Sequence, residues 1–137
     1  MHVTERNIVY ITDKPLAIQD VDLSRIEFDG NSEYASRHIY ETLASICNYA
    51  YYYDDIQEFC QNIRKHKNDI VFTTLYGAAS ANSKALIPAI CEANNITYVG
   101  ADSYSQMLCN DKYLSKRYAQ GYGIVGTAIL KNAMLFQ

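Results

Sequence analysis

The sequence predicts an α/β domain of three layers, in which a mostly parallel, four-stranded sheet carries helices on both faces. Short runs of β-branched and aromatic residues alternate along the chain with longer stretches in which apolar residues recur every three or four positions. The chain has 137 residues, 49% of them hydrophobic and 20% charged, which is typical of one globular domain with its own core. The alternation favours right-handed crossovers and a parallel, Rossmann-like sheet.

The first strand is expected over residues 7–12 (NIVYIT). A polar connection, residues 13–32, follows it and is unusually long for a compact domain, which indicates either a functional loop or a mobile one. The next helix begins at Glu33, with Ser32 as its expected N-cap. Spacings of four and three place four apolar residues on its buried face: Ile39, Leu43, Ile46 and Cys47.

The second strand is predicted at residues 49–53 (YAYYY), and Asp54 is placed to cap the helix that follows. The residues expected to be buried in this helix are Ile56, Phe59, Cys60 and Ile63. Basic residues collect at its end, over residues 64–67, where cations suit the helix dipole. The clearest strand signal is the run DIVFTTL at residues 69–75, which is typical of a parallel strand covered on both faces.

A small polar loop, residues 76–82, leads to a helix predicted over residues 83–93. Pro88 lies inside this helix and is expected to be tolerated with a bend. The residues predicted to face inward are Leu86, Ile87, Ile90 and Cys91.

The fourth strand is expected at residues 96–99 and ends at Gly100. Two helical stretches follow, the first beginning at Asp102 and the second at Asp111. Gly121 ends the second helix, because glycine readily adopts the backbone conformation that stops a helix.

The composition argues against several partners. A formal net charge of −3 provides no large positive field for nucleic acid or for an anionic membrane. The sequence shows neither a signal peptide nor a membrane span, so a cytoplasmic location is expected.

The cysteines and histidines predict no catalytic or metal-binding residue. The four cysteines form no CxxC pair and have no histidine at zinc-ligand spacing, so they are interpreted as small buried residues in a reducing compartment. The three histidines, His2, His38 and His66, are interpreted as solvated side chains.

Three known motifs are excluded, either because required residues are missing or because the surrounding secondary structure is wrong. Residues 121–126 match GxGxxG, but a predicted helix precedes them where a dinucleotide site needs a strand. Residues 77–84 lack the second glycine and the lysine of a phosphate-binding loop. The strand over residues 69–75 ends without the aspartate that a receiver domain would phosphorylate.

The expected ligand site lies beyond the carboxyl ends of the strands, as in other doubly wound sheets. The loops at this edge are residues 13–32, 76–82 and 100–102. The last two of these loops each lead into a helix. The first backbone N–H groups of a helix are unpaired and favour an anionic group. The tyrosines of residues 49–53 are interpreted as residues that fill and flank the sheet rather than stack on a ligand.

Residues 69–130 resemble the N-terminal domain of ATP-grasp ligases. The run DIVFTTLYG is followed by a helix, by ITYVG and, twelve residues after Gly100, by Lys112 of an Asp-Lys pair. Lys116 completes a DKxxxK pattern, and a Gly-Ile turn follows at residues 123–124. The closest subtype is the D-alanine–D-alanine ligase group, in which one strand ends in LHG and a later one in YxG before a DKxxxK helix.

The resemblance implies roles for three residues. Lys112 would contact the ATP phosphates, and Glu33 would help to recognise the amine of the substrate. Tyr76 stands where the family has a histidine near the substrate, so it can donate a hydrogen bond but cannot act as an imidazole. The substrate would be a small amino acid or a dipeptide-type molecule, and the complete enzyme would use ATP and magnesium.

The resemblance also implies a domain boundary. Residues 1–123 form the ligase-like α/β domain, and residues 124–137 begin a central nucleotide-binding domain or form a tail. The apolar end of the chain indicates a truncated enzyme, which we expect to be inactive alone and able to pair with a second copy. The alternative is a stand-alone, non-catalytic binding or interaction module that keeps this fold.

Overall fold

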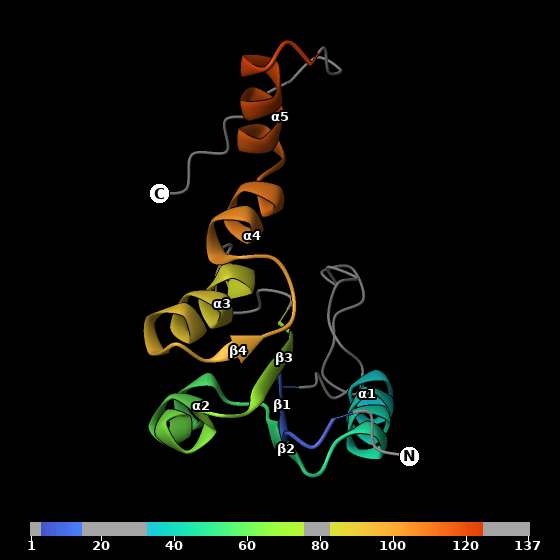
Figure 1. Cartoon of the computed structure of the whole chain (residues 1–137). Coiled ribbons are helices and arrows are strands. Elements are labelled where there is room, and N and C mark those ends of the chain that lie inside the picture. The colour runs from blue at the N-terminus through green and yellow to red at the C-terminus, as the bar shows by residue number, and fades with distance from the viewer. Residues whose placement is uncertain (1–3, 15–32, 76–82, 125–137) are drawn as a thin grey trace.

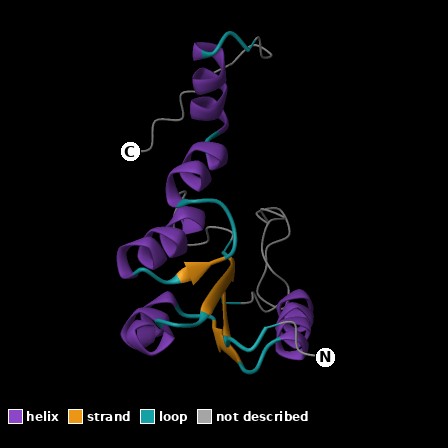
Figure 2. Ribbon diagram, in the orientation of Figure 1, coloured by secondary structure: helices purple, strands orange, loops and turns teal. Residues whose placement is uncertain are grey.

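The computed structural model describes residues 4–14, 33–75 and 83–124. These residues form the three-layer, Rossmann-like α/β fold predicted from the sequence (Figures 1 and 2). The strands are β1 (Ile8–Thr12), β2 (Ala50–Tyr53), β3 (Ile70–Thr74) and β4 (Thr97–Tyr98). The helices are α1 (Glu33–Ile46), α2 (Ile56–Asn62), the short 3₁₀ helix η2 (Ile63–His66), α3 (Ser83–Asn94), α4 (Ser103–Asn110) and α5 (Lys112–Gly121). None of the helices in the described ranges has both the length and the apolar character needed to cross a membrane.

The sheet has the order β2-β1-β3-β4, and each neighbouring pair is parallel. The chain first places β2 on one side of β1 and then returns to place β3 on the other side. This reversal creates a topological switch point between the carboxyl ends of β1 and β3, where ligands bind in doubly wound sheets. Helix α1 covers one face, and α2 and α3 cover the other (Figure 1).

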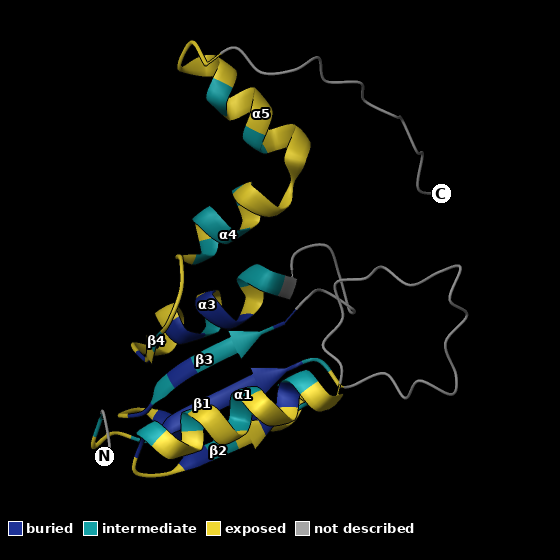
Figure 3. Ribbon diagram, turned by 90° about the vertical axis from the view of Figure 1, so that its right-hand side faces the viewer, coloured by how far each residue is buried: buried dark blue, intermediate teal, exposed yellow. Residues whose placement is uncertain are grey.

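Strand β1 is the centre of the core. All five of its residues are buried, and successive side chains alternate between the two faces of the sheet. Val9 and Ile11 join the larger apolar cluster with residues of α2 and α3, whereas Ile8 joins a smaller cluster beside α1. Figure 3 shows β1 as a buried strand behind α1.

The prediction that β3 is covered on both faces is confirmed in part. Val71 is fully buried in the cluster beside α2 and α3, whereas Ile70 and Phe72 pack against the cluster beside α1 and remain partly exposed. The reason is that α1 packs over β1 and β2, so it shields only part of the β3 face on its side of the sheet.

The predicted apolar helix faces are confirmed in part. Cys47 is buried, Leu43 and Ile46 are partly buried in the cluster beside the sheet, and Ile39 is partly buried. Cys60 and Cys109 are exposed, which contradicts their interpretation as buried residues, although Cys91 is buried as expected. Leu86 was expected inside but is 41% exposed.

The first turn of α2 is capped by Asp55, not by Asp54 as predicted. The Asp55 carboxylate accepts a hydrogen bond from the backbone N–H of Gln57 at 2.7 Å. The predicted cap of α1, Ser32, lies outside the described residues. The predicted caps Asp102 and Asp111 are confirmed at the starts of α4 and α5.

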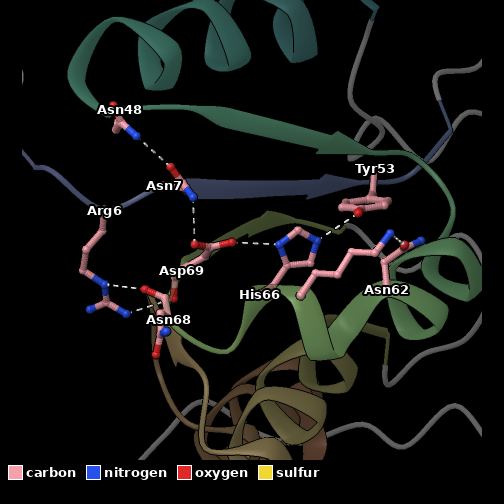
Figure 4. A network of polar contacts seen from close by, with 9 residues as sticks. Arg6, Asn7, Asn48, Tyr53, Asn62, His66, Asn68 and Asp69 are labelled. Carbon is pink, nitrogen blue, oxygen red and sulfur yellow. Dashed lines mark hydrogen bonds and ion pairs between the residues drawn. The ribbon is translucent and has the colours of Figure 1, made fainter.

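A buried polar network joins η2 to strands β2 and β3 (Figure 4). His66 is 1% exposed, so its interpretation as a solvated side chain is wrong. Its Nδ1 lies 2.8 Å from Oδ2 of Asp69, and its Nε2 lies 2.9 Å from the hydroxyl oxygen of Tyr53. Asn7 donates to the other oxygen of Asp69 at 3.1 Å.

The network satisfies both nitrogens of the imidazole. A carboxylate only accepts, so Nδ1 of His66 donates to Asp69, and Nε2 shares a hydrogen bond with the hydroxyl of Tyr53, which can either donate or accept. The Phe59 ring stacks on the imidazole, with ring centroids 6.2 Å apart and planes 17° apart. Because a buried polar atom is costly when it has no partner, these bonds fix η2 against the sheet.

Replacing Tyr53→Phe is expected to lower the free energy of unfolding by about 1–3 kcal/mol, because Nε2 of His66 would remain buried without its partner. Urea unfolding followed by circular dichroism measures the change. The control is Tyr34→Phe, since the Tyr34 side chain lies on the exposed surface of α1. Equal unfolding midpoints for the two variants would show that the Tyr53 hydroxyl does not stabilise the fold.

Candidate functional site

Three hydroxyl groups lie at the switch point between β1 and β3. The hydroxyl oxygen of Tyr10 is 2.7 Å from Oγ1 of Thr74, which donates to Oγ1 of Thr12 at 3.2 Å. Tyr10 and Thr12 are fully buried on β1. The hydroxyl cluster (Tyr10, Thr12 and Thr74) therefore ties together the carboxyl ends of the two central strands, next to the expected ligand-binding edge.

Aromatic rings cover the sheet beside this hydroxyl cluster. Tyr10 lies 5.7 Å from Tyr52 and 6.0 Å from Phe72, measured between ring centroids. Tyr40 of α1 packs edge-on against Tyr52 at 5.9 Å. These rings support the interpretation of the strand tyrosines as residues that fill and flank the sheet.

The rim of this region on the β2 side is acidic. Burial raises the pKa of the Tyr52 phenol, and the negative charges of Asp54 and Glu33 raise it further. The two carboxylates thus act on the same phenol from the strand end and from the first turn of α1. Such a rim favours a cationic group, such as the ammonium of an amino acid.

Glu33 itself lies on the surface. Its side chain is 75% exposed and forms an ion pair with Arg37, one turn further along α1, at 3.1 Å. An exposed pair of this type contributes little to stability, so a ligand could replace it at small cost. Tyr76 lies outside the described residues.

Lys112 lies in the first turn of α5, immediately after the cap. The Asp111 carboxylate accepts hydrogen bonds from the backbone N–H groups of Tyr113 at 2.8 Å and Leu114 at 2.9 Å. The aspartate of the Asp-Lys pair therefore has a structural role, because it starts the helix that carries the lysine. Lys112 and Lys116 are both exposed and are one helical turn apart.

One carboxylate attaches α4 to the rest of the domain. Glu92, near the end of α3, accepts a hydrogen bond from the Tyr98 hydroxyl at 2.7 Å. It also accepts from the backbone N–H of Ser103 at 2.9 Å and from the Ser103 hydroxyl at 2.7 Å. The chain turns between β4 and α4 at Gly100, whose φ of +128° is suited to glycine.

These hydrogen bonds shift the pKa of both side chains. The bonds that it accepts from Tyr98 and Ser103 lower the pKa of Glu92 below its ordinary value of 4.5. Donation to Glu92 is the main cause that raises the pKa of the Tyr98 phenol to about 12. The Glu92 bonds are therefore strongest when the carboxylate is ionised and the phenol is neutral.

The structure does not bring the predicted residues together. Glu33 lies in the first turn of α1, and its negative charge is one of the causes that raise the pKa of Tyr52. Lys112 lies on α5, which packs against α4 on the side away from the sheet (Figure 1). The described residues thus contain two separate candidate surfaces, an acidic and aromatic edge and a basic helix.

The hydroxyl cluster was not predicted from the sequence. A signal for it exists, since Tyr10 and Thr12 interrupt an apolar strand and Thr74 ends another. Their meeting depends on β1 and β3 being neighbours, because Tyr10 and Thr74 are far apart in the sequence.

No protein-family model and no curated protein matches this chain. The resemblance to carboxylate–amine ligases therefore depends on the sequence motifs in residues 69–130. Function has to be inferred from the site itself.

The backbone N–H of Ser103 is expected to report the ionisation of Glu92. Because the folded-state pKa of Glu92 is lowered, its stabilising bonds are fully present above pH 4.5 and are lost as the pH falls through that lower pKa. An NMR titration should show the Ser103 amide shifting in this acidic range. In the matched variant Glu92→Gln this titration should disappear, and an unchanged titration would contradict the assignment.

Proposed function

We propose that this chain is the N-terminal, substrate-binding domain of a cytoplasmic, ATP-dependent carboxylate–amine ligase of the D-alanine–D-alanine ligase type. The observation that carries the proposal is the Asp111-Lys112 pair at the start of α5. Asp111 caps the helix, and Lys112 and Lys116 are exposed one turn apart. Two ammonium groups at this spacing suit a chain of phosphates.

The lysine side chains, rather than the helix end, would meet the phosphates. Asp111 already accepts from two of the first backbone N–H groups of α5, and its negative charge disfavours an anion there. Within the described part of the chain, the side chain of Lys112 forms no hydrogen bond or ion pair, so its ammonium group is available. Its proposed role is to bind and orient the nucleotide.

ATP would supply the phosphoryl group that activates the carboxylate before the amine attacks it. The described residues contain no group of three His, Cys, Asp or Glu side chains arranged to hold a metal ion. Other parts of the complete enzyme would hold the magnesium ion and carry the catalytic residues.

The substrate would bind at the acidic and aromatic edge. Glu33 and Asp54 offer negative charge to an ammonium group, and Tyr52 offers an aromatic surface beside them. Tyr76 would donate a hydrogen bond where the family has a histidine. A small amino acid or a dipeptide-type molecule carries the ammonium group that this edge favours.

The second candidate function is that of a non-catalytic interaction module. Exposed apolar residues on α4 and α5 favour this candidate. Met107, Leu114 and Tyr118 are each more than 40% exposed. The reading frame beyond Gln137 separates the candidates. A frame that continues into a glycine-rich loop and metal-binding acids supports the ligase, and an immediate stop supports the module.

In the complete protein, Lys112→Ala is expected to raise the KM for ATP about tenfold or more, because an ammonium contact to phosphate is lost. Steady-state kinetics with varied ATP measure the effect. Lys67→Ala is the control, since Lys67 is also exposed but lies after η2, outside both candidate surfaces. A KM for ATP equal to that of the control would remove Lys112 from the nucleotide site.

The purified 137-residue chain is expected to release no ADP from ATP in the presence of magnesium and amino acids. The reason is that phosphoryl transfer needs nucleotide and metal held in place, and the proposal assigns most of that task to other domains. A coupled assay for ADP detects turnover. Ligation by this chain alone would contradict its assignment as one domain of a larger enzyme.

A further inference from the structure

The most deeply buried residue of α1 is a serine. Ser36 is 2% exposed, and no other residue of this 14-residue helix is fully buried. The residue that a helix buries most deeply against a sheet is usually apolar, because the packing of apolar surface stabilises the contact. A serine side chain adds very little apolar surface to the core, so packing alone does not account for a serine at this position.

The hydroxyl group of Ser36 has no hydrogen-bond partner. Among the described residues, its Oγ is the one buried side-chain polar atom without such a partner. Ser45 on the same helix differs, since its hydroxyl donates to the carbonyl of Thr42 at 2.7 Å. Buried polar atoms are nearly always paired, so an unpaired one indicates that a further molecule supplies the missing partner.

Ser36 lies on the side of α1 that faces the sheet, near the carboxyl ends of the strands (Figure 3). It is four residues before Tyr40, which packs against Tyr52 of β2, and residues at this spacing share one side of a helix. Cys47 follows α1 and is buried with Ile8 at the start of β1, so the helix runs opposite to the strands. A helix rises roughly 6 Å over four residues and a strand roughly 7 Å over two, so Ser36 lies about level with the residues that follow β2.

The surroundings of this hydroxyl carry negative charge. Glu33 is three residues before Ser36, so the two side chains are neighbours on the first turn of α1. Asp54 directly follows β2, and after burial, which is the main cause, the charges of Asp54 and Glu33 raise the pKa of the Tyr52 phenol. The start of a helix ordinarily favours an anion, but two carboxylates disfavour an anion here and favour a cationic donor.

We propose, on the basis of the amine-bearing substrate proposed above, that Ser36 is a binding residue for a primary ammonium group at the first turn of α1. A primary ammonium group has three N–H donors. Its acceptors would be the Ser36 hydroxyl and the carboxylates of Glu33 and Asp54. The ring of Tyr52 would lie beside the cation. A secondary amine would bind less well, because its extra carbon replaces one of the three donors.

The same hydroxyl lowers the stability of the chain without its ligand. Ser36 then keeps a buried polar group unpaired, and replacing it by alanine removes that group with little loss of packing. Ser36→Ala should therefore unfold at a higher urea concentration than the unaltered chain and yet bind an amine more weakly. A serine with a purely structural role would not change stability and binding in opposite directions.

NMR titration of the 137-residue chain with D-alanine, which carries a primary ammonium group, tests the assignment. Ser36→Ala should weaken binding about fivefold or more, because one hydrogen bond to a charged group is lost. Ser45→Ala is the control on the same helix, since the Ser45 hydroxyl is exposed and should not affect binding. Equal binding by the two variants, or no binding of D-alanine to the unaltered chain, would overturn the proposal.

Two analogues of D-alanine test the chemistry of the ligand. N-methyl-D-alanine should bind about fivefold or more weakly, because it lacks one N–H donor. Propionate has the carboxylate without the ammonium group and should not displace D-alanine. Displacement by propionate would show that the first turn of α1 binds an anion, and equal binding of N-methyl-D-alanine would show that the site does not require a primary amine. Either result would overturn the proposal.

Urea unfolding tests the remaining alternative, in which water alone occupies the space beside Ser36. A Ser36→Ala variant that is no more stable than the unaltered chain would support water and overturn the proposal. These measurements use neither ATP nor ligation, so they are independent of the ligase assignment. That assignment fails instead through an immediate stop after Gln137 or through an unchanged KM for ATP in Lys112→Ala.

Discussion

Strand β1 is flanked by parallel strands on both sides and covered by helices on both faces, and its burial is the constraint on which the other elements depend. Each residue of β1 is buried, including Tyr10 and Thr12, whose hydroxyl groups need partners there. Thr74 of β3 bonds to both of them, so the pairing of β3 with β1 helps to satisfy the polar atoms of the most buried strand. The same pairing that completes the core thereby creates the switch point at which a ligand can bind.

The buried imidazole connects this core to its surroundings. His66 joins Tyr53 at the end of β2 to Asp69 at the start of β3, two strands that do not pair with each other. Because β1 lies between those strands, the network holds them on either side of it. A polar cluster inside a small domain thus contributes to strand order as well as to stability, since a different order would leave its hydrogen bonds unmade.

The sequence could predict the elements because their signals are local. The helix starts at Asp102 and Asp111 depend on hydrogen bonds to backbone groups two or three residues away, and both were predicted correctly. The burial of His66 could not be predicted, since it depends on partners from two strands, and the exposure of Cys60 depends on which side of a seven-residue helix meets the sheet. For the candidate site, the resemblance to ATP-grasp ligases indicated Glu33 and Lys112. The hydroxyl cluster could not be predicted, because its prediction needs the order of the strands in the sheet.

The attachment of α4 through Glu92 has a consequence for variation in this protein. The carboxylate fixes the distance between the end of α3 and the first N–H of α4, so the connection through β4 has a set length. Insertions or deletions within residues 96–102 would change the direction in which α4 and α5 leave the domain. Natural variants and engineered fusions should therefore conserve the length of this segment even where they replace its residues, and length variation is better accommodated beyond Gly121, where α5 has ended.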